Sequence, residues 1–321
     1  MTITNYSLPA IAIVTPSFEQ GKYLEAAMKS VLEQSYPFLE YIVIDGGSKD
    51  GSVEIIEKYA DQLHYWVSEP DEGQSDAINK GFRRTDKAII VGWLNSDDIL
   101  LPDTLLKVVR TFQANPDAVL VYGDVQSIDA EGRVINQTRF NQYEVEDLMQ
   151  FNIICQPAVF TRLKIVNALG GVDPSYHFLM DHHLWLRLAM EGDIIHIPEF
   201  LAQARYHEDA KNVAQAANFG VEAFKLVGWM RSNLYLHRIM GETNLGKRVE
   251  SAAHRFNARY LMDANKNKEA FHEYWMSFKL SPRTCLKEWH RWLFTMLALF
   301  GLGFLKKLFY GAKRAKYKKA N

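Results

Sequence analysis

Short runs of β-branched and aliphatic residues alternate with segments of helical period over about residues 10 to 125. The runs that have the length and composition of buried strands are 11–15, 41–45, 64–68, 88–94 and 119–123. After the first of them, apolar residues recur at the spacing of one helix face, namely Leu24, Ala27, Met28, Val31 and Leu32. This alternation predicts an α/β domain in which helices cover a mainly parallel sheet.

Composition bounds the class of protein. The 321 residues are 48% hydrophobic and 23% charged, enough for one large domain with an appended part. A formal net charge of -1 argues against a surface built for nucleic acid. Because Cys155 and Cys285 lie far apart and in no metal-ligand spacing, we expect two free thiols in a reducing compartment. The N-terminus lacks the pattern of a secretory signal, so we expect a cytoplasmic protein.

The second half of the chain has a different pattern. Residues 126 to 210 are less regular, and their clearest helix spans 179–192, which we expect to end at Gly192. Residues 212 to 282 read as all-helical, with a pair of helices stopped by Pro282.

The C-terminus combines an apolar run with a basic one. Residues 292–305 are strongly apolar, and residues 306–319 are strongly basic. The apolar run is shorter than the roughly 20 residues of a membrane-spanning helix. The pairing predicts a helix in the interface of an anionic membrane, on the inner face. The alternative is a helix docked on the protein's own core, with a solvated basic tail.

Polar residues follow several predicted strands, and ligands bind beyond the carboxyl ends of strands in open parallel sheets. Asp45 precedes Gly46 and Gly47, which places a carboxylate on a loop that can approach a ligand closely, although a plain turn gives the same pattern. Asp76 and Asn79 share one helix face by their spacing, as they also would in an ordinary capped helix.

Asp97 and Asp98 are adjacent at the end of an apolar run. Their charges repel each other and are costly to bury unless a cation or hydrogen-bond donors compensate. A divalent cation that also binds phosphate oxygens is the usual compensation. The alternative is an N-cap, with Asp98 or Asp103 opening the following helix.

The ordered motifs resemble the family 2 glycosyltransferases of the GT-A fold over about residues 8 to 210. The motifs are "TPSFEQGKYL", "VIDGGSKDGS", "SEPDEGQSDAINKGF", "GWLNSDD", "QPAVFTR", "MDHHLWLRLA" and "ARYH". We therefore expect a GT-A domain at 8–210, a helical extension at 211–284 and a membrane-associating segment at 285–321.

The resemblance implies roles for single positions. Asp181 matches the general base, and Asp98 matches the direct ligand of Mg²⁺ or Mn²⁺ on the diphosphate. His207 is a second metal candidate, with an ordinary loop histidine as the alternative. The positions that match nucleotide-sugar contacts are Thr15, Pro16, Glu19, Asp45, Asp76, Asn79 and Asp97.

Two positions depart from the family pattern. Gly46 stands where the family has a second aspartate that reads uracil, which leaves uridine, guanosine and deoxythymidine diphosphates open. Met180 stands where the family has a glutamate before the base. The neighbouring His182 and His183 also occur beside an aspartate in metal phosphoesterases, but consecutive helical residues point about 100° apart. We expect these histidines to pack or to lie on the helix surface.

The resemblance implies a metal-dependent inverting glycosyltransferase, with a nucleoside-diphosphate sugar as donor and a glycan or lipid-linked acceptor. Cell-surface polysaccharide or glycolipid synthesis would fit a peripheral membrane protein. The alternatives are a nucleotide-sugar binding partner without transfer activity and a metal-dependent phosphoesterase. A nucleotidyltransferase is less favoured, because the segment after the first strand lacks a Gly-rich loop with a basic residue.

Overall fold

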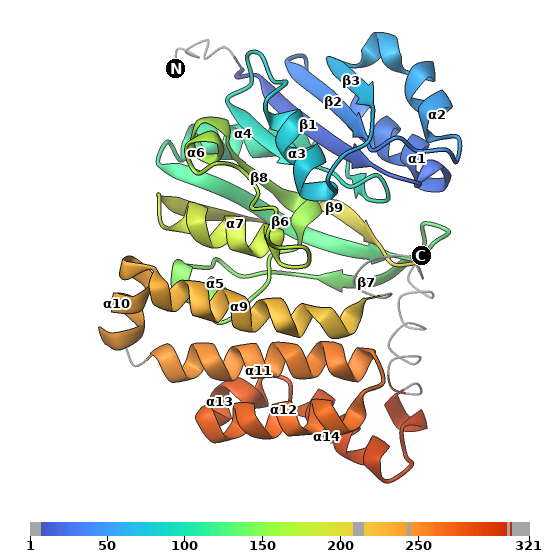
Figure 1. Cartoon of the computed structure of the whole chain (residues 1–321). Coiled ribbons are helices and arrows are strands. Elements are labelled where there is room, and N and C mark those ends of the chain that lie inside the picture. The colour runs from blue at the N-terminus through green and yellow to red at the C-terminus, as the bar shows by residue number, and fades with distance from the viewer. Residues whose placement is uncertain (1–7, 208–214, 243–244, 307–308, 310–321) are drawn as a thin grey trace.

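The computed structural model describes residues 8–207, 215–242, 245–306 and 309. In these ranges one sheet has the strand order β3-β2-β1-β4-β8-β6-β9-β5, and β7 pairs with β6 (Figure 1). The strands are β1 (Ile11–Ser17), β2 (Leu39–Asp45), β3 (Tyr65–Ser68), β4 (Ile90–Trp93), β5 (Ile99–Leu100), β6 (Ala118–Ile128), β7 (Val134–Thr138), β8 (Val159–Arg162) and β9 (Asp193–Arg205).

The first four strands are parallel. β1 pairs with β2 and β4, and β2 pairs with β3, in a register that sets Ser17 beside Asp45 and Asp45 beside Ser68. The loops after these strands therefore emerge at one edge of the sheet. β8 runs antiparallel between β4 and β6, whereas β6 and β9 are parallel. The α/β prediction is confirmed, and the irregular region supplies the antiparallel strands.

Alternation along the strands gives the sheet two apolar faces. Ile11 and Ile13 pack with one set of helices, whereas Ala12 and Val14 pack with the other. The first face is covered by α1 (Gly21–Leu32), α2 (Ser52–Lys58) and α4 (Thr104–Ala114). The second is covered by α3 (Gln74–Phe82), α5 (Val145–Met149), α6 (Leu163–Ala168) and α7 (Met180–Ala189).

One predicted helix end needs correction, and a second, at Pro282, is confirmed, because α12 ends at Leu280. The helix α7 ends at Ala189, and Gly192 does not adopt the left-handed conformation of a C-terminal cap. A Cβ on Gly192 would lie 2.9 Å from the carbonyl oxygen of Asp117, so glycine is needed there for close approach. Pro282 does not merely stop a helix, because it opens α13 at a first-turn position where its missing N–H costs nothing.

The C-terminal helices are stacked beside the sheet domain, with α9 nearest to it, then α11, then α12 to α14 (Figure 1). Their bounds are α9 (Phe219–Ser232), α10 (Leu234–Glu242), α11 (Leu245–Asp263), α12 (Asn267–Leu280), α13 (Pro282–Leu286) and α14 (Trp289–Leu299). Ala223, Leu226 and Met230 of α9 belong to the same apolar core as α7. The expected boundary between 284 and 285 falls inside α13.

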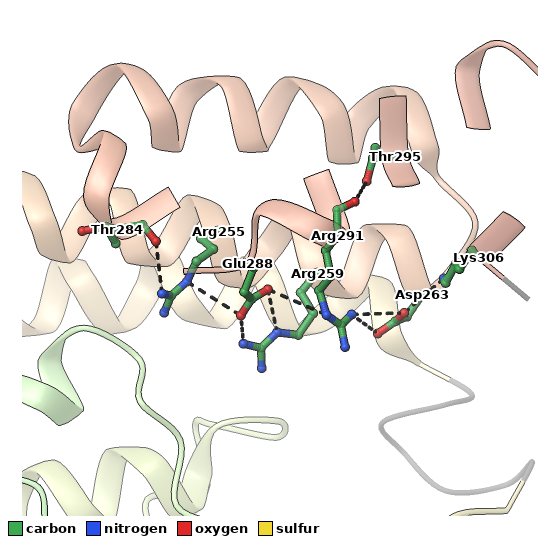
Figure 2. Close-up of polar contacts among 8 residues, drawn as sticks. All are labelled: Arg255, Arg259, Asp263, Thr284, Glu288, Arg291, Thr295 and Lys306. Atoms are coloured by element: carbon green, nitrogen blue, oxygen red, sulfur yellow. Dashed lines mark hydrogen bonds and ion pairs between the residues drawn. The ribbon is translucent and has the colours of Figure 1, made fainter. Parts of the chain in front are cut away.

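A buried carboxylate joins α11 to the start of α14 (Figure 2). Glu288 accepts a hydrogen bond from Nε of Arg259 at 3.2 Å, and the Nε atoms of Arg255 and Arg291 each lie 3.9 Å from its oxygens. Burial alone would raise the pKa of Glu288, but the arginines, Arg259 foremost, hold it below the usual range. The cluster therefore fastens α14 to α11 by ion pairs as well as by apolar contact.

One face of α14 stays exposed. Trp289, Leu293 and Met296 follow each other at helical spacing on that face, and Phe300 continues it. Of the helices in the described ranges, none has both the length and the apolar character needed to cross a membrane. Apart from Lys306 and Phe309, the basic segment 306–319 lies outside the described residues.

Candidate active site

Asp98 lies in the loop between β4 and β5 and is only 5% exposed. Its Oδ1 accepts the backbone N–H of Arg205 at 2.9 Å, and its Oδ2 accepts from Nδ2 of Asn95 at 3.3 Å. Burial first, and then the charge of Asp97, nevertheless raise the pKa of Asp98 well above its usual range. These donors therefore compensate the carboxylate only in part.

Asp97 faces the end of β9. Its Oδ2 lies 3.0 Å from Nε2 of His207, and its carbonyl oxygen accepts from Nε of Arg205 at 2.9 Å. The ring of His207 packs 4.9 Å from that of Tyr23 in α1. The predicted pair and the late histidine thus lie together, although 110 residues separate Asp97 from His207 in the chain.

The residues at this pair fit a hard divalent cation. The N-cap alternative holds for Asp103 by position, since Asp103 is the N-cap residue of α4, although its side chain makes no capping bond; Asp98 does not cap the helix and instead accepts from Arg205. In the described part of the chain, no group of three or more His, Cys, Asp or Glu residues is arranged to hold a metal ion. A cation at the under-compensated pair would therefore complete its coordination with water and ligand oxygens, as Mg²⁺ does with phosphates.

Asp181 is the second residue of α7, and its Oδ1 accepts the backbone N–H of His182 at 2.7 Å. The start of α3 connects α7 to the aspartate pair: Nε2 of Gln74 donates to Oδ1 of Asn95 at 2.8 Å, and the hydroxyl of Ser75 contacts the sulfur of Met180 at 3.1 Å. Asn95, which donates to Asp98, and Met180, which precedes Asp181, thus both contact the start of α3.

The loop after β1, which is predicted to contact the nucleotide, is hydrogen-bonded to the loop after β2. Thr15 is fully buried and its hydroxyl lies 3.0 Å from that of Tyr41, while Pro16 is buried within β1. Glu19 has a φ of 51°, and its Oε1 accepts from the backbone N–H of Lys49 at 2.9 Å. Glu19 is the exposed member of this set. The nucleotide contacts of all three residues stay predictions.

Asp45 shapes the loop that follows β2. It is fully buried, and its oxygens accept from the backbone N–H groups of Gly47 and Ser48 and from the hydroxyls of Ser48 and Ser68, at 2.7–3.0 Å. These bonds match the plain-turn interpretation. Contact of Asp45 with a nucleoside stays a prediction.

Asp76 and Asn79 share α3 but bond in different directions. Asp76 accepts from the backbone N–H of Glu72 at 3.2 Å and lies 3.2 Å from Nζ of Lys80. Burial would raise its pKa, but these two partners hold it below the usual range. Asn79 exchanges two hydrogen bonds with the backbone of Val172, at 2.7 and 2.9 Å. Asn79 therefore holds the loop that precedes α7.

Two residues that did not stand out in the sequence flank Gly46. A Cβ on Gly46 would lie 2.9 Å from Oδ2 of Asp71 and 3.0 Å from Cδ2 of Phe18. The Phe18 ring is 62% exposed. A carboxylate and an exposed aromatic ring thus lie where the side chain of the missing aspartate would begin. The pairing of β2 with β3 brings Asp71 there, and the sequence alone gave no signal for this contact.

His182 and His183 are packing residues. Nε2 of His182 bonds to the carbonyl oxygen of Leu148 at 2.9 Å, and its ring stacks on Phe151. The ring of His183 instead contacts Tyr176 and Trp229. Because the two rings are buried against different partners, they do not converge on one ion.

Comparison with known proteins agrees with this arrangement. Residues 12–165 match the family model described as glycosyl transferase family 2. An uncharacterized glycosyltransferase of Nostoc sp. is 26% identical over 254 residues, which cover 75% of this chain and 78% of the relative. Chondroitin synthase of Escherichia coli is 26% identical over 230 residues, which cover 71% of this chain and 33% of the synthase.

Solved structures share the fold. Residues 1–349 of S. aureus TarS in complex with UDP-GlcNAc align with a TM-score of 0.54 and 13% identity, over 91% of this chain and 92% of that one. The mannosyltransferase PcManGT from Pyrobaculum calidifontis, in complex with GDP-Man and Mn²⁺, aligns with a TM-score of 0.60 and 18% identity, over 94% and 88%. The family match spans the strands that lead to Asp45 and to the Asp97–Asp98 pair. These matches support a glycosyltransferase of family 2 with the GT-A fold.

Proposed function

We propose that the protein is a metal-dependent inverting glycosyltransferase that moves a sugar from a nucleoside-diphosphate sugar to an acceptor hydroxyl. The carrying observation is that the start of α3 contacts both Asn95, which donates to Asp98, and Met180, which precedes Asp181. Two of the similar structures hold UDP-GlcNAc and GDP-Man, the latter with Mn²⁺, which supports this class of donor. We assign the catalytic domain to residues 8–210, a helical extension to 211–284 and a membrane-associating segment to 285–321.

The donor would lie across the carboxyl edge of the sheet. Asp97 faces the ribose, and the loops that carry Thr15, Pro16, Glu19 and Asp45, together with α3 residues Asp76 and Asn79, border the nucleotide. Asp98 and His207 would hold Mg²⁺ or Mn²⁺, which would neutralise charge on the leaving diphosphate. The raised pKa of Asp98 supports this assignment, because a buried charge that its donors only partly compensate favours a cation.

Asp181 supplies the base for the acceptor. Its carboxylate takes the proton of the acceptor hydroxyl while the hydroxyl oxygen forms a bond to the anomeric carbon. The bond from that carbon to the diphosphate oxygen breaks on the opposite face, and the electron pair leaves with the diphosphate. One displacement of this kind inverts the anomeric configuration.

The acceptor belongs to cell-surface polysaccharide or glycolipid synthesis, with the protein attached to an anionic membrane surface. The exposed apolar face of α14 supports attachment, because the basic segment 306–319 follows this helix in the sequence. An apolar helix face next to lysines and arginines matches the chemistry of an anionic bilayer interface.

Transfer assays test the proposed function. Radiolabelled nucleotide sugars of uridine, guanosine and deoxythymidine diphosphate are offered with Mn²⁺ and with glycan or lipid-linked acceptors. We expect transfer with one donor, with inverted configuration in the product, and no transfer by the Asp98→Ala and Asp181→Ala variants. Retained transfer by these variants would contradict the mechanism. Donor binding without transfer to any acceptor would indicate a binding partner, and phosphodiester hydrolysis without acceptor would indicate a phosphoesterase.

A further inference from the structure

Glu222 of α9 holds the backbone that leads into the catalytic helix. Its carboxylate is 7% exposed and accepts three consecutive backbone N–H groups, from His177 at 2.6 Å, Phe178 at 2.8 Å and Leu179 at 2.8 Å. A carboxylate that accepts several backbone N–H groups forms charge-assisted hydrogen bonds, which are stronger than bonds between neutral groups.

These bonds hold the segment that enters α7, including its N-cap residue. Leu179 is the N-cap residue of α7, and its own side chain offers no hydrogen bond to the helix. The first N–H groups of a helix need acceptors, and negative charge is favoured at this end of the helix dipole. Glu222 accepts the N–H of the N-cap residue Leu179 and of the two residues before it, and places a negative charge near this end of the helix. Asp181 follows Leu179 by two residues, so the carboxylate of Glu222 fixes the place where the first turn of α7 begins.

A second residue of α9, one turn after Glu222, also contacts the segment before α7. Nζ of Lys225 donates to the carbonyl oxygen of Ser175 at 2.5 Å and lies 4.1 Å from the ring centroid of Tyr176. On the other side, the hydroxyl of Ser75 in α3 contacts the sulfur of Met180 at 3.1 Å. The approach to Asp181 is therefore held by α9 and by α3.

We propose that Glu222 is a positioning residue for Asp181, acting through the three N–H groups of residues 177–179. The inference rests on the proposed role of Asp181 as the base. Proton transfer demands that the base reach the acceptor hydroxyl at hydrogen-bond distance, and small displacements of reacting groups are costly in rate. Both α7, which carries Asp181, and α9, which carries Glu222, lie outside the residues 12–165 that match the family model.

The Glu222→Gln variant tests the inference, because it keeps the size of the side chain. Glutamine offers one oxygen, and its amide N–H group would face a backbone N–H donor. We expect kcat to fall by roughly 10- to 100-fold. The KM for the donor should stay within about twofold, because the proposed donor contacts come from other residues. A matched control is Glu242→Gln in α10, which removes an exposed carboxylate paired with Arg238.

Amide hydrogen exchange gives a readout that does not depend on activity. We expect faster exchange at His177, Phe178 and Leu179 in Glu222→Gln and no change in Glu242→Gln. Unchanged exchange, or a kcat within about twofold of wild type in a folded variant, would overturn the inference. If Glu222→Gln fails to fold, Glu222→Asp decides by the same measurements, because its shorter side chain keeps the charge and reaches fewer N–H groups. A wild-type protein without transfer activity would contradict the proposed function, whereas the exchange result stands independently.

Discussion

The backbone N–H of Arg205 donates to Oδ1 of Asp98 at 2.9 Å, and this bond joins residues 107 positions apart. It fastens the end of β9 to the loop after β4. The bond orients the Asp98 carboxylate, yet burial and the neighbouring Asp97 still raise the pKa of Asp98. The protein thus holds the Asp98 carboxylate in place without fully stabilising its charge. Removal of this charge should therefore affect folding and transfer differently.

Asp98→Asn should therefore impair transfer much more than folding. We expect the transfer rate at saturating Mn²⁺ to fall by roughly 100-fold or more. The melting temperature should stay equal or rise at pH 7, because the amide oxygen still accepts from Arg205 and no charge is buried. Initial rates and thermal unfolding measure the two effects. Asp103→Asn, at an exposed position in the same loop region, is the control. A large loss of stability in Asp98→Asn would contradict this separation.

Asp181→Asn should lower kcat while donor binding persists. Removal of a general base costs typically about 100- to 10,000-fold. Thermal shift with nucleoside diphosphate and Mn²⁺ should match the wild type, because ligand binding raises apparent stability only through the intact donor site. Glu191→Gln, an exposed carboxylate just after α7, is the control. Equal loss of nucleotide binding and of kcat would assign Asp181 to the donor instead.

The buried histidines of α7 should make stability depend on pH. Burial lowers the pKa of His182 to about 4 from an ordinary 6.5. The unfolded chain therefore binds a proton at this residue below about pH 6.5, whereas the folded protein binds it only near pH 4. Stability that is present above pH 6.5 is lost as pH falls through this window, by about 3 kcal/mol for this residue.

Urea unfolding at pH 7.5, 5.5 and 4.5 measures this loss in the wild type and in His182→Gln. The glutamine amide can still donate to the carbonyl oxygen of Leu148, so the variant should fold. We expect the wild type to lose more stability than the variant between pH 6.5 and pH 4. Parallel pH profiles for the two proteins would show that His182 does not titrate as its burial predicts.

Glu288→Gln should loosen α14 from α11. The arginine cluster keeps its charge when the carboxylate is removed, and breaking one partner out of a buried ion-pair cluster costs about 3–5 kcal/mol. Urea unfolding measures the loss, and limited proteolysis shows whether cleavage moves into α14. Glu269→Gln, exposed on α12, should leave both unchanged. An unaltered midpoint in Glu288→Gln would mean that apolar contacts alone dock α14.

Local pattern made part of the site predictable. Adjacent aspartates at the end of a buried run indicate a binding site at the sheet edge, because both signals lie within a few residues. Arg205 and Glu222 gave no such signal, since their contacts cross 107 and at least 43 residues and depend on strand order and helix packing. The prediction that Gly192 ends a helix was wrong for a different reason. A glycine required for close approach to Asp117 has the same sequence appearance as a helix cap.

Membrane attachment is best tested by single substitutions in α14. Truncation after Arg283 would remove Cys285 and Glu288, which are buried, so it would confuse attachment with folding. Leu293→Glu and Phe300→Glu instead place a charge on the exposed apolar face. We expect both to reduce sedimentation with vesicles of anionic lipid, and high salt to reduce wild-type sedimentation, because the basic segment is screened.

Leu234→Glu on α10 is the matched control, since Leu234 is 88% exposed and lies on a different helix. A glutamate lowers the affinity of an interfacial helix for the membrane, because it removes apolar area and is repelled by anionic lipid. The same change at Leu234 should leave sedimentation at the wild-type level. If the two α14 variants also sediment like the wild type, the exposed face of α14 does not contact the membrane.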